Sequence, residues 1–323
     1  MTSHDVATEA GVSQATVARV FSSPDKVAPA TTAKVRDAAE RLGYVPNAIA
    51  RSLKAQRTDI VGAIVPAAGE YWQHVLTLFS RQLTESGKQL LLFSFAEPRQ
   101  VDGVLETVAR YRLDGLVAAS ASIGAAHLAR IEQLAMPSVA FNQPAASGLL
   151  PSVTVDNETG SRALAAHVVE RGARSAIFIG GVASTSTDQQ RYRGAVTELG
   201  THGVACRYLE AGAFSYEAGY KVAQALADTP ELPDAVLVGS DEVAFGVIDG
   251  LRERGIDAPR DLLLTGFDGL PQASWAGYDL TTLEQPIELL VEHALTRLLQ
   301  GDAAAVGDVV VPGTIRQGRT TNA

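Results

Sequence analysis

Several polar and aromatic residues each follow an apolar run, where a strand of a parallel sheet would end. Arg191 offers a fork of donors for a carboxylate, a phosphate or two sugar hydroxyls, and Asp268 accepts from hydroxyl or amine groups. Trp72 and Phe214 could sandwich a sugar ring or a base. Two alternatives stay open: the aromatic residues could be core, and Asp268 could cap a helix or hold a loop. The candidate binding residues are Tyr71, Trp72, Asn142, Arg191, Phe214, Ser240 and Asp268.

A second group of residues near the N-terminus could contact DNA. Gln14 and Arg19 can pair with adenine and guanine edges through two hydrogen bonds each. Ala15 and Ala18 can meet a thymine methyl group, and Thr16 is better placed for a phosphate. The alternative is a small helical cap whose polar side chains are only solvated.

The segment DVATEAGVSQATVARVF, residues 5–21, is predicted to place this group on two short helices. Asp5–Glu9 forms the first helix, and Gly11 supplies its left-handed end. Ser13 caps the second helix, Gln14–Phe21, and joins the candidate DNA contacts. Two helices that cross steeply through Gly-Val-Ser make the helix-turn-helix that fits a DNA major groove.

A third helix is predicted over Pro29–Leu42, so that three helices share one small core. The next stretch, residues 44–58, is weakly amphipathic and too short to be stable as a helix alone. Residues 1–58 hold eight basic and five acidic residues, a net charge of +3, whereas the remainder holds 19 basic and 31 acidic residues, a net charge of −12. This distribution separates a surface for a polyanion from a body that phosphate repels.

From residue 59 onward, apolar strands alternate with amphipathic helices. One series of strands begins near residues 59, 88, 114 and 137, and a second begins near residues 175, 205, 234 and 261. This pattern indicates two lobes, each a parallel sheet covered by helices on both faces. The chain is expected to cross between them near Asn142–Val155, near Gly269–Leu283 and at residues 309–319. Loops beyond the carboxyl ends of the strands would then form one cleft.

Composition narrows the class of protein. No signal segment is recognised and no apolar run reaches the roughly 18 residues of a membrane span, so a cytoplasmic location without a membrane partner is expected. The single cysteine, Cys206, excludes a disulfide framework and a thiol-rich metal site. Neither a nucleophile elbow nor a phosphate-binding glycine loop is found, and the six histidines are scattered. No enzyme activity, metal or cofactor is predicted.

Asp5 to Thr58 resembles the DNA-binding head and hinge of the LacI/GalR family of bacterial transcription regulators. The resemblance rests on DVATEAGVSQATVARVF, RLGYVP and NAIARSLKAQRT. It implies that the hinge folds when two subunits meet on operator DNA and that Leu53 wedges into the minor groove, which unstacks a base step. Packing between domains is the alternative role for Leu53. The hinge residues that would contact DNA are Asn47, Arg51, Leu53 and Lys54.

The rest of the chain resembles the periplasmic-binding-protein fold of the same family, on the markers SVTVDNETG, FIGG, RYRG, GSDEVAFGV, LTGFDGLP and LTTLEQP. By this resemblance Arg191 belongs to an R-x-x-G motif, Asp268 to a G-[FY]-D motif, and Phe214 is a cleft aromatic. Ala67 and Ser240 depart from the residues common in sugar-binding members, which leaves fewer groups for hydroxyls. A sugar or another polar metabolite is still the expected effector.

These patterns predict an α/β protein with an N-terminal all-α helix-turn-helix head and a two-lobed, periplasmic-binding-protein-like body of parallel sheets. The expected function is a ligand-responsive, sequence-specific transcription regulator, in most members a repressor, that binds palindromic operator DNA as a homodimer. The alternative is a solute-binding protein without a role in transcription. The predicted domains are a head (1–45), a hinge (46–58) and an effector-binding and dimerisation body (59–323), with lobes of about 59–142 with 284–308 and about 155–268 with 309–323.

Overall fold

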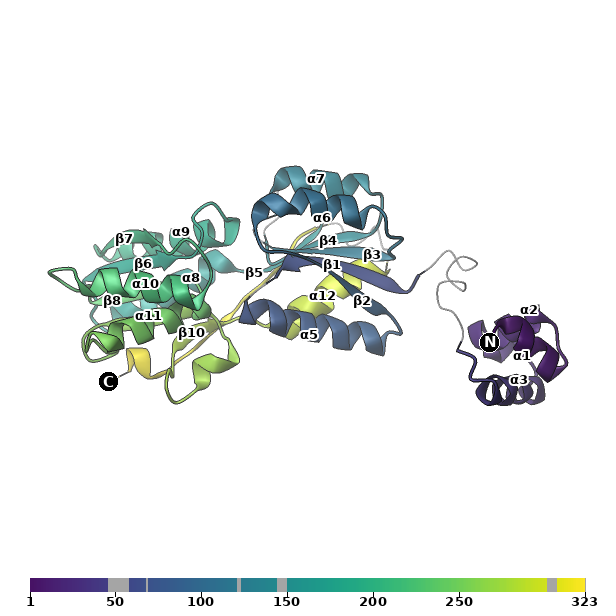
Figure 1. The fold of residues 1–323 in the computed structure, drawn as a ribbon. Helices are drawn as coiled ribbons and strands as arrows, with labels where there is room; N and C mark the ends of the chain where they lie inside the picture. Colours follow the sequence, from purple (N-terminus) through teal and green to yellow (C-terminus); the bar gives the residue numbers. More distant parts are fainter. Residues whose placement is uncertain (46–57, 68, 121–122, 144–149, 301–306, 323) are drawn as a thin grey trace. The chain divides into compact units, whose positions relative to one another are not determined.

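The chain divides into two compact units, Met1–Ile60 with Arg112–Asp114 and Val61–Tyr111 with Gly115–Ala323. We call the first unit the head and the second unit the body, and Ile60, at the boundary, begins the first strand of the body. No helix among the described residues is both long and apolar enough to cross a membrane. The computed structural model describes residues 1–45, 58–67, 69–120, 123–143, 150–300 and 307–322 (Figure 1).

Helices α1 and α2 of the head begin at residues whose side chains accept from backbone N–H groups of the first turn. Helix α1 begins two residues earlier than predicted because Thr2 and Asp5 form a capping box, in which each side chain accepts from the other residue's backbone N–H. Gly11 ends α1 with φ 61°, and Ser13 caps α2 by accepting from the Thr16 N–H at 3.1 Å, as predicted. The elements are α1 Ser3–Ala10, α2 Gln14–Ser22, the 3-10 turn η1 Pro24–Lys26 and α3 Pro29–Arg41.

The three helices share the predicted apolar core. Val6 of α1, Val20 of α2 and Val35 of α3 are completely buried in it. Phe21 and Tyr44 pack at its edge with ring centroids 6.1 Å apart. Burial of this side of α2 leaves its opposite side in solvent.

The body contains two six-stranded sheets. The first has the strand order β11-β5-β4-β3-β1-β2 (Figure 1). Apolar residues run continuously through its central strands because helices cover both faces, α5 and α12 on one side and α6 and α7 on the other. Its elements are β1 Ile60–Pro66, α5 Glu70–Glu85, β2 Gln89–Phe95, η2 Pro98–Gln100, α6 Val101–Val108, β3 Gly115–Ala119, α7 Ala125–Gln133, β4 Ser138–Phe141, β5 Ser152–Val155, α12 Ile287–Gln300 and β11 Val309–Val311.

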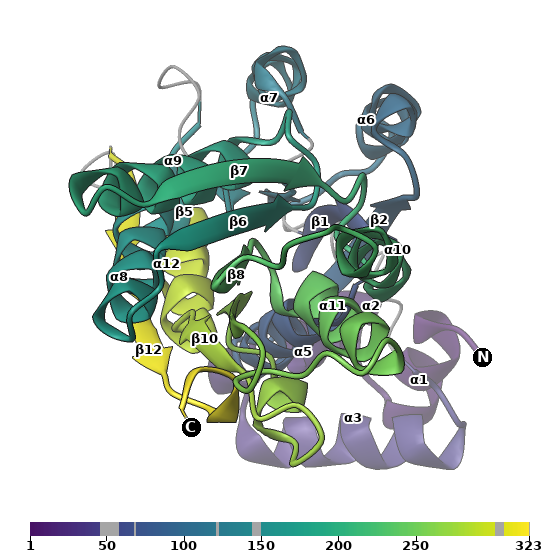
Figure 2. The ribbon, with the colours of Figure 1, turned by 90° about the vertical axis from the view of Figure 1, so that its left-hand side faces the viewer.

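The second sheet has the order β12-β10-β9-β8-β6-β7, and only the pairing of β12 with β10 is antiparallel among the described pairs. Helices α8 and α9 cover one face, and α10 and α11 cover the other (Figure 2). Its elements are α8 Asn157–Glu170, β6 Ser175–Gly180, α9 Ser186–Thr201, β7 Ala205–Glu210, α10 Tyr216–Ala227, β8 Ala235–Val238, α11 Asp241–Glu253, β9 Leu263–Asp268, η3 Pro271–Ser274, β10 Thr281–Glu284, β12 Thr314–Arg316 and η5 Arg319–Thr321.

The chain crosses between the described strands of the two sheets three times, and two of these crossings lie later in the sequence than predicted. Residues 152–155 form β5, which pairs with β4 in the first sheet, and residues 281–284 form β10, which pairs with β9 in the second. Residues 309–311 form β11 and pair with β5, so the first sheet extends beyond the expected lobe boundaries. The chain therefore crosses after β5, after β10 and between β11 and β12. Four-residue strands next to a crossing carry too short an apolar pattern to be distinguished from connections.

Helices α10 and α11 pack so closely that a side chain at Gly246 has no room. A Cβ there would lie 2.0 Å from the Tyr216 carbonyl oxygen of α10. We expect Gly246→Ala to lower the free energy of unfolding by about 1–3 kcal/mol, because the backbone must move and this strain outweighs the gain in helix propensity.

The matched control is Gly103→Ala in α6, where a Cβ would meet nothing within 4 Å. Better helix propensity should raise stability there by up to about 1 kcal/mol. Thermal and urea unfolding of both variants measures the difference, and equal effects would show that the α10–α11 contact is not tight.

Candidate functional site

A cavity of about 420 Å³ lies in the body where the two sheets present the carboxyl ends of their strands. Residues at or after the carboxyl ends of β1, β2, β3 and β4 line one side, and residues at or after the carboxyl ends of β6, β7, β8 and β9 line the other. The lining residues are Pro66, Ala67, Gly69, Tyr71, Trp72, Phe95, Ala96, Ser120, Asn142, Val182, Thr187, Arg191, Gly212, Ala213, Phe214, Ser215, Ser240, Glu242 and Asp268.

Arg191 and Asp268 form a buried ion pair in the cavity wall. Nη1 of Arg191 lies 3.1 Å from Oδ1 of Asp268 and donates to the Gly239 carbonyl at 2.6 Å. Burial raises the pKa of Asp268, whereas the Arg191 charge opposes that shift. The pair places a positive donor and a negative acceptor side by side, an arrangement suited to hydroxyl groups of a polar ring.

Other residues hold the Arg191 side chain in one orientation. Nε donates to Oδ1 of Asn157 at 2.8 Å, and the guanidinium carbon lies 3.8 Å from the centre of the Phe267 ring. The hydrogen bonds found among the described residues use Nε and Nη1 of this guanidinium. Nη2 makes no hydrogen bond to the described residues.

A chain of hydrogen bonds connects the two sheets at the cavity. The Tyr71 hydroxyl, on α5, donates to Oε1 of Gln285 at 3.2 Å, and Nε2 of Gln285 donates to Oδ1 of Asp268 at 2.7 Å. Burial raises the pKa of Tyr71, so this hydroxyl remains protonated. Trp72 meets Tyr71 edge to face, with centroids 5.0 Å apart, and extends the aromatic part of the wall.

Two acidic residues at the start of α11 have different surroundings. Asp241 is fully buried behind the wall, where it accepts from the Leu270 N–H at 2.7 Å and the Thr282 hydroxyl at 2.5 Å. Glu242 lines the cavity and accepts from the Glu70 N–H at 3.2 Å. Burial raises the pKa of each carboxyl to about 7, and the nearby Asp268 charge adds to the shift in both.

Three further features concern the cavity's backbone and side chains. Asn142 and Asp268 have positive φ angles of 55° and 130°, which non-glycine residues adopt rarely and which often accompany binding sites. Oδ1 of Asn142 is buried and has no hydrogen-bond partner among the described residues. The Phe214 ring lies against Gly181, where a Cβ would be 2.3 Å from Cδ1 of the ring.

The structure brings all seven candidate binding residues into this one cavity. Ser240 also accepts from the Val243 N–H at 3.3 Å, so its hydroxyl caps α11. Sequence reasoning missed Glu242, although it stands inside the GSDEVAFGV marker, and Asn157, which stands inside SVTVDNETG. It also missed Gln285, whose contacts come from residues that are distant in the chain.

The exposed side of α2 is the candidate DNA interface of the head. Gln14, Ala15, Ala18 and Arg19 are exposed there. The Gln14 amide donates to the Ser3 hydroxyl at 2.9 Å, while Thr16 bonds to the capping Ser13. The remaining candidate DNA contacts lie outside the described residues: Asn47, Arg51, Leu53 and Lys54.

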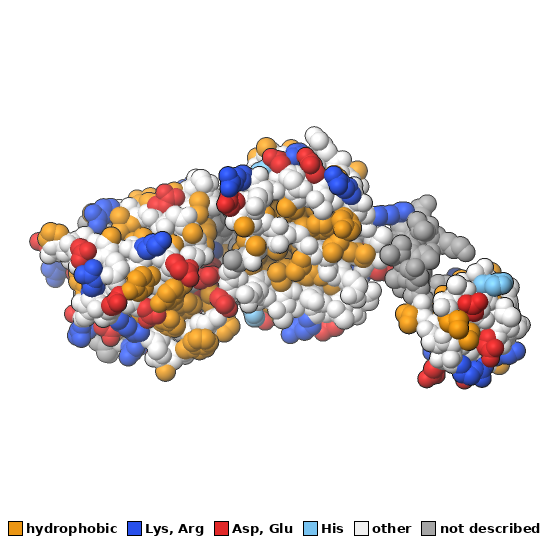
Figure 3. Space-filling model, in the orientation of Figure 1, with side chains coloured by type: hydrophobic (Ala, Val, Ile, Leu, Met, Phe, Trp, Pro, Cys, Tyr) orange, Lys and Arg blue, Asp and Glu red, His pale blue; other side chains and the backbone are white. Residues whose placement is uncertain are grey.

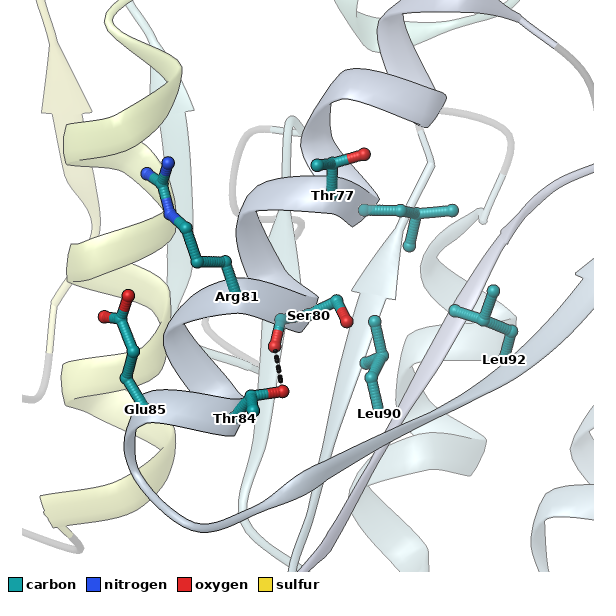
Figure 4. A pocket seen from close by; sticks show the side chains of 8 residues that line it. Thr77, Ser80, Arg81, Thr84, Glu85, Leu90 and Leu92 are labelled. Atoms are coloured by element: carbon teal, nitrogen blue, oxygen red, sulfur yellow. Dashed lines mark hydrogen bonds between the residues drawn. The ribbon is translucent and has the colours of Figure 1, made fainter.

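A second hollow, of about 700 Å³, lies between α5 and the edge strand β2 (Figure 4). We call it the α5–β2 groove. Leu90 and Leu92 form its strand side, and Leu76 together with polar and charged side chains of α5 forms the other (Figure 4). Figure 3 shows hydrophobic side chains gathered on this half of the body, and the side chain of Leu92 is 49% exposed.

Comparisons with known proteins agree over both units. The profile described as "Bacterial regulatory proteins, lacI family" matches residues 2–47, and "Periplasmic binding protein-like domain" matches residues 165–321. Catabolite control protein A of Priestia megaterium is 29% identical over 330 residues, with 99% of each chain covered. The HTH-type transcriptional regulator RegA of Clostridium saccharobutylicum is 30% identical over 305 residues, which cover 92% of this chain and 91% of that one. The lac repressor dimer, in its complex with operator and the anti-inducer ONPF, has a similar fold, with a TM-score of 0.87, 23% identity and coverage of 100% and 99%.

Proposed function

Because the chain belongs to the LacI family of bacterial regulatory proteins, we propose that it is a ligand-responsive repressor that binds a palindromic operator as a homodimer. A small polar effector, a sugar or a related metabolite, occupies the cavity of the body and alters operator affinity. The observation that carries this proposal is the buried Arg191–Asp268 pair, which lies in an open cavity of a chain that also exposes Gln14 and Arg19 on a helix-turn-helix.

The cavity supports control by a ligand because both sheets contribute to its wall. An effector that contacts Tyr71 and Asn142 on one side and Arg191 on the other stabilises one arrangement of the two sheets over another. In a dimer that arrangement sets the separation of the two heads, and hence whether both recognition helices reach their half-sites. Typical coupling of this kind is about 1–3 kcal/mol.

The α5–β2 groove is proposed as part of the dimer surface, with a second copy of the chain as its occupant. Strand β2 is an edge strand on which Leu92 is exposed and Leu90 is half-buried, and exposed apolar edges promote association. Arg81 and Glu85 stand one helical turn apart on α5 beside it. Because their charges are opposite, a two-fold axis can pair each with the other residue of the second copy.

Replacing Leu92 with arginine should therefore weaken dimerisation at least tenfold, since a charge would be buried in an apolar contact at a cost of about 1.4 kcal/mol or more. Sedimentation equilibrium measures the change. Val310→Arg is the matched control, because Val310 is similarly exposed at the opposite edge of the same sheet. An unchanged dimer in Leu92→Arg, or an equal loss in both variants, would exclude the groove.

Selection of duplexes from a random DNA pool tests the function as a whole. The proposal predicts a palindromic site whose affinity falls steeply with salt concentration and changes when effector is present. A protein that binds small molecules but prefers no duplex sequence would instead be a solute-binding protein.

A further inference from the structure

The charges in the cavity differ from those expected for a neutral sugar alone. Three charged side chains line it: Arg191, Asp268 and Glu242. Arg191 and Asp268 neutralise each other at 3.1 Å. Glu242 forms no ion pair with a basic residue of the described chain, and its recorded partner is the Glu70 N–H. When Glu242 is ionised, the cavity therefore carries one negative charge that no basic residue of the described chain balances.

Acidic groups around Glu242 add to the negative charge in this part of the cavity. Glu70 of α5, Glu217 of α10 and Asp268 of β9 act on it with negative charge, and burial together with these charges raises its pKa to about 7. A positive ligand group placed there would relieve this repulsion. Arg191, on α9, is the cation of the cavity wall and is already paired.

Asn142 points independently to a ligand that donates hydrogen bonds. Asn142 lines the cavity and is 7% exposed as a residue, and its buried Oδ1 has no partner within the described residues. A buried acceptor without a partner costs about 1–3 kcal/mol. A ligand that donates a hydrogen bond to it would remove this cost and so bind more tightly. Within this cavity, Asn142 and Glu242 therefore favour the same kind of ligand group.

Aromatic residues provide a flat apolar surface beside the carboxylate. A Cβ built on Gly69 would lie 3.4 Å from Cδ1 of Trp72 and 3.5 Å from Oε2 of Glu242, so both groups flank this glycine. A cation next to Glu242 would therefore also lie near the indole ring of Trp72. Phe95 and Phe214 complete the apolar part of the wall.

We propose that the effector is a ring-sized compound with a protonated amino group, such as an amino sugar, whose ammonium group binds Glu242 beside Trp72. This inference rests on the proposed function and specifies its effector. The hydroxyls of the ring bind Arg191 and Asp268, and a donor of the ring binds Oδ1 of Asn142.

Calorimetry with matched pairs of compounds tests the proposal: glucosamine against glucose, galactosamine against galactose, and mannosamine against mannose. At least one amine should bind tenfold or more tightly than its parent sugar at pH 8. In Glu242→Gln this preference should fall to threefold or less. Glu158→Gln is the control, because it removes a carboxylate that pairs with Arg193 and does not line the cavity, and it should keep the preference.

The pH dependence gives a second readout. Only ionised Glu242 attracts the ammonium group, so amine affinity should fall as pH decreases through about 7, roughly fivefold between pH 7 and 6. Glu242→Gln should lack this part of the dependence, although Asp241 and Asp268 titrate in both proteins. Parent sugars that bind as tightly as their amines, an unchanged preference in Glu242→Gln, or no binding of any amine at millimolar concentration would overturn the proposal.

Measuring how each ligand changes operator affinity distinguishes the inferred ligand class from the proposed repressor function. An amine that binds without changing DNA affinity would support the ligand class and contradict the repressor mechanism. A neutral sugar that binds and changes DNA affinity, while the amines do not bind, would support the repressor mechanism and contradict the ligand class.

Discussion

Arg191→Ala is expected to abolish the effector response while operator binding persists. The substitution removes the guanidinium donors and leaves the buried Asp268 carboxylate without its counter-ion, with Gln285 as its remaining donor. Effector affinity should fall by about 100-fold or more, since a charge-assisted hydrogen bond and the geometry of its partner are lost together. Calorimetry with the effector and anisotropy with operator DNA measure the two properties separately.

Two further variants make this result interpretable. Arg193→Ala lies two positions along the same helix, where its exposed side chain pairs with Glu158, and it should retain effector binding. Arg191→Lys keeps the charge without the fork and should also lose most of the affinity. Because breaking a buried pair costs about 3–5 kcal/mol, the thermal stability of each variant must be measured alongside. Unchanged effector affinity in a folded Arg191→Ala protein would contradict the assignment.

Arg19→Ala is expected to reduce discrimination between operator and altered operator sites. Arg19 is exposed on α2 and has the geometry to read a guanine edge, so its loss should cost about 1–3 kcal/mol at the base pair it reads. Competition gel shifts with single base-pair changes across the selected site would locate that pair as the position where preference disappears.

The control for charge alone is Arg41→Ala. Arg41 lies at the end of α3, where it pairs with Glu9 and Asp37, so it should weaken binding to all sequences equally or not at all. If Arg19→Ala likewise weakened every site equally, Arg19 would be a phosphate contact rather than a base contact.

The sequence was most informative where local signals suffice. Gly11 and Ser13 predicted the turn between α1 and α2 because a left-handed end and an N-cap depend on adjacent residues only. The seven candidate binding residues gathered in one cavity because parallel strands present their carboxyl ends at one edge, which places residues after each strand together.

The site residues that the sequence did not predict depend on tertiary contacts. Asn157 orients Arg191 from 34 positions away, and Gln285 bonds to Asp268 and to Tyr71, which is 214 positions away. No local pattern encodes such partners. Glu242 was overlooked because the start of a helix is an ordinary place for an exposed acid, and its unusual pKa arises from burial in the folded body.

The positive φ angles of Asn142 and Asp268 bear on how the cavity could act as a switch. Both residues follow or end a strand, and one lies on each sheet of the body. Strained backbone at such positions persists only where surrounding contacts stabilise it. A ligand that bonds to both side chains would therefore favour the arrangement of the sheets in which both conformations are compatible.

The central claim is that occupation of the cavity and operator binding are coupled. The most direct test measures effector affinity twice, on free protein and on protein saturated with the selected operator, and measures operator affinity with and without saturating effector. Linkage predicts that both affinities change by one and the same factor, about 5-fold to 150-fold. Effector affinity that is identical on free and operator-bound protein would contradict the account.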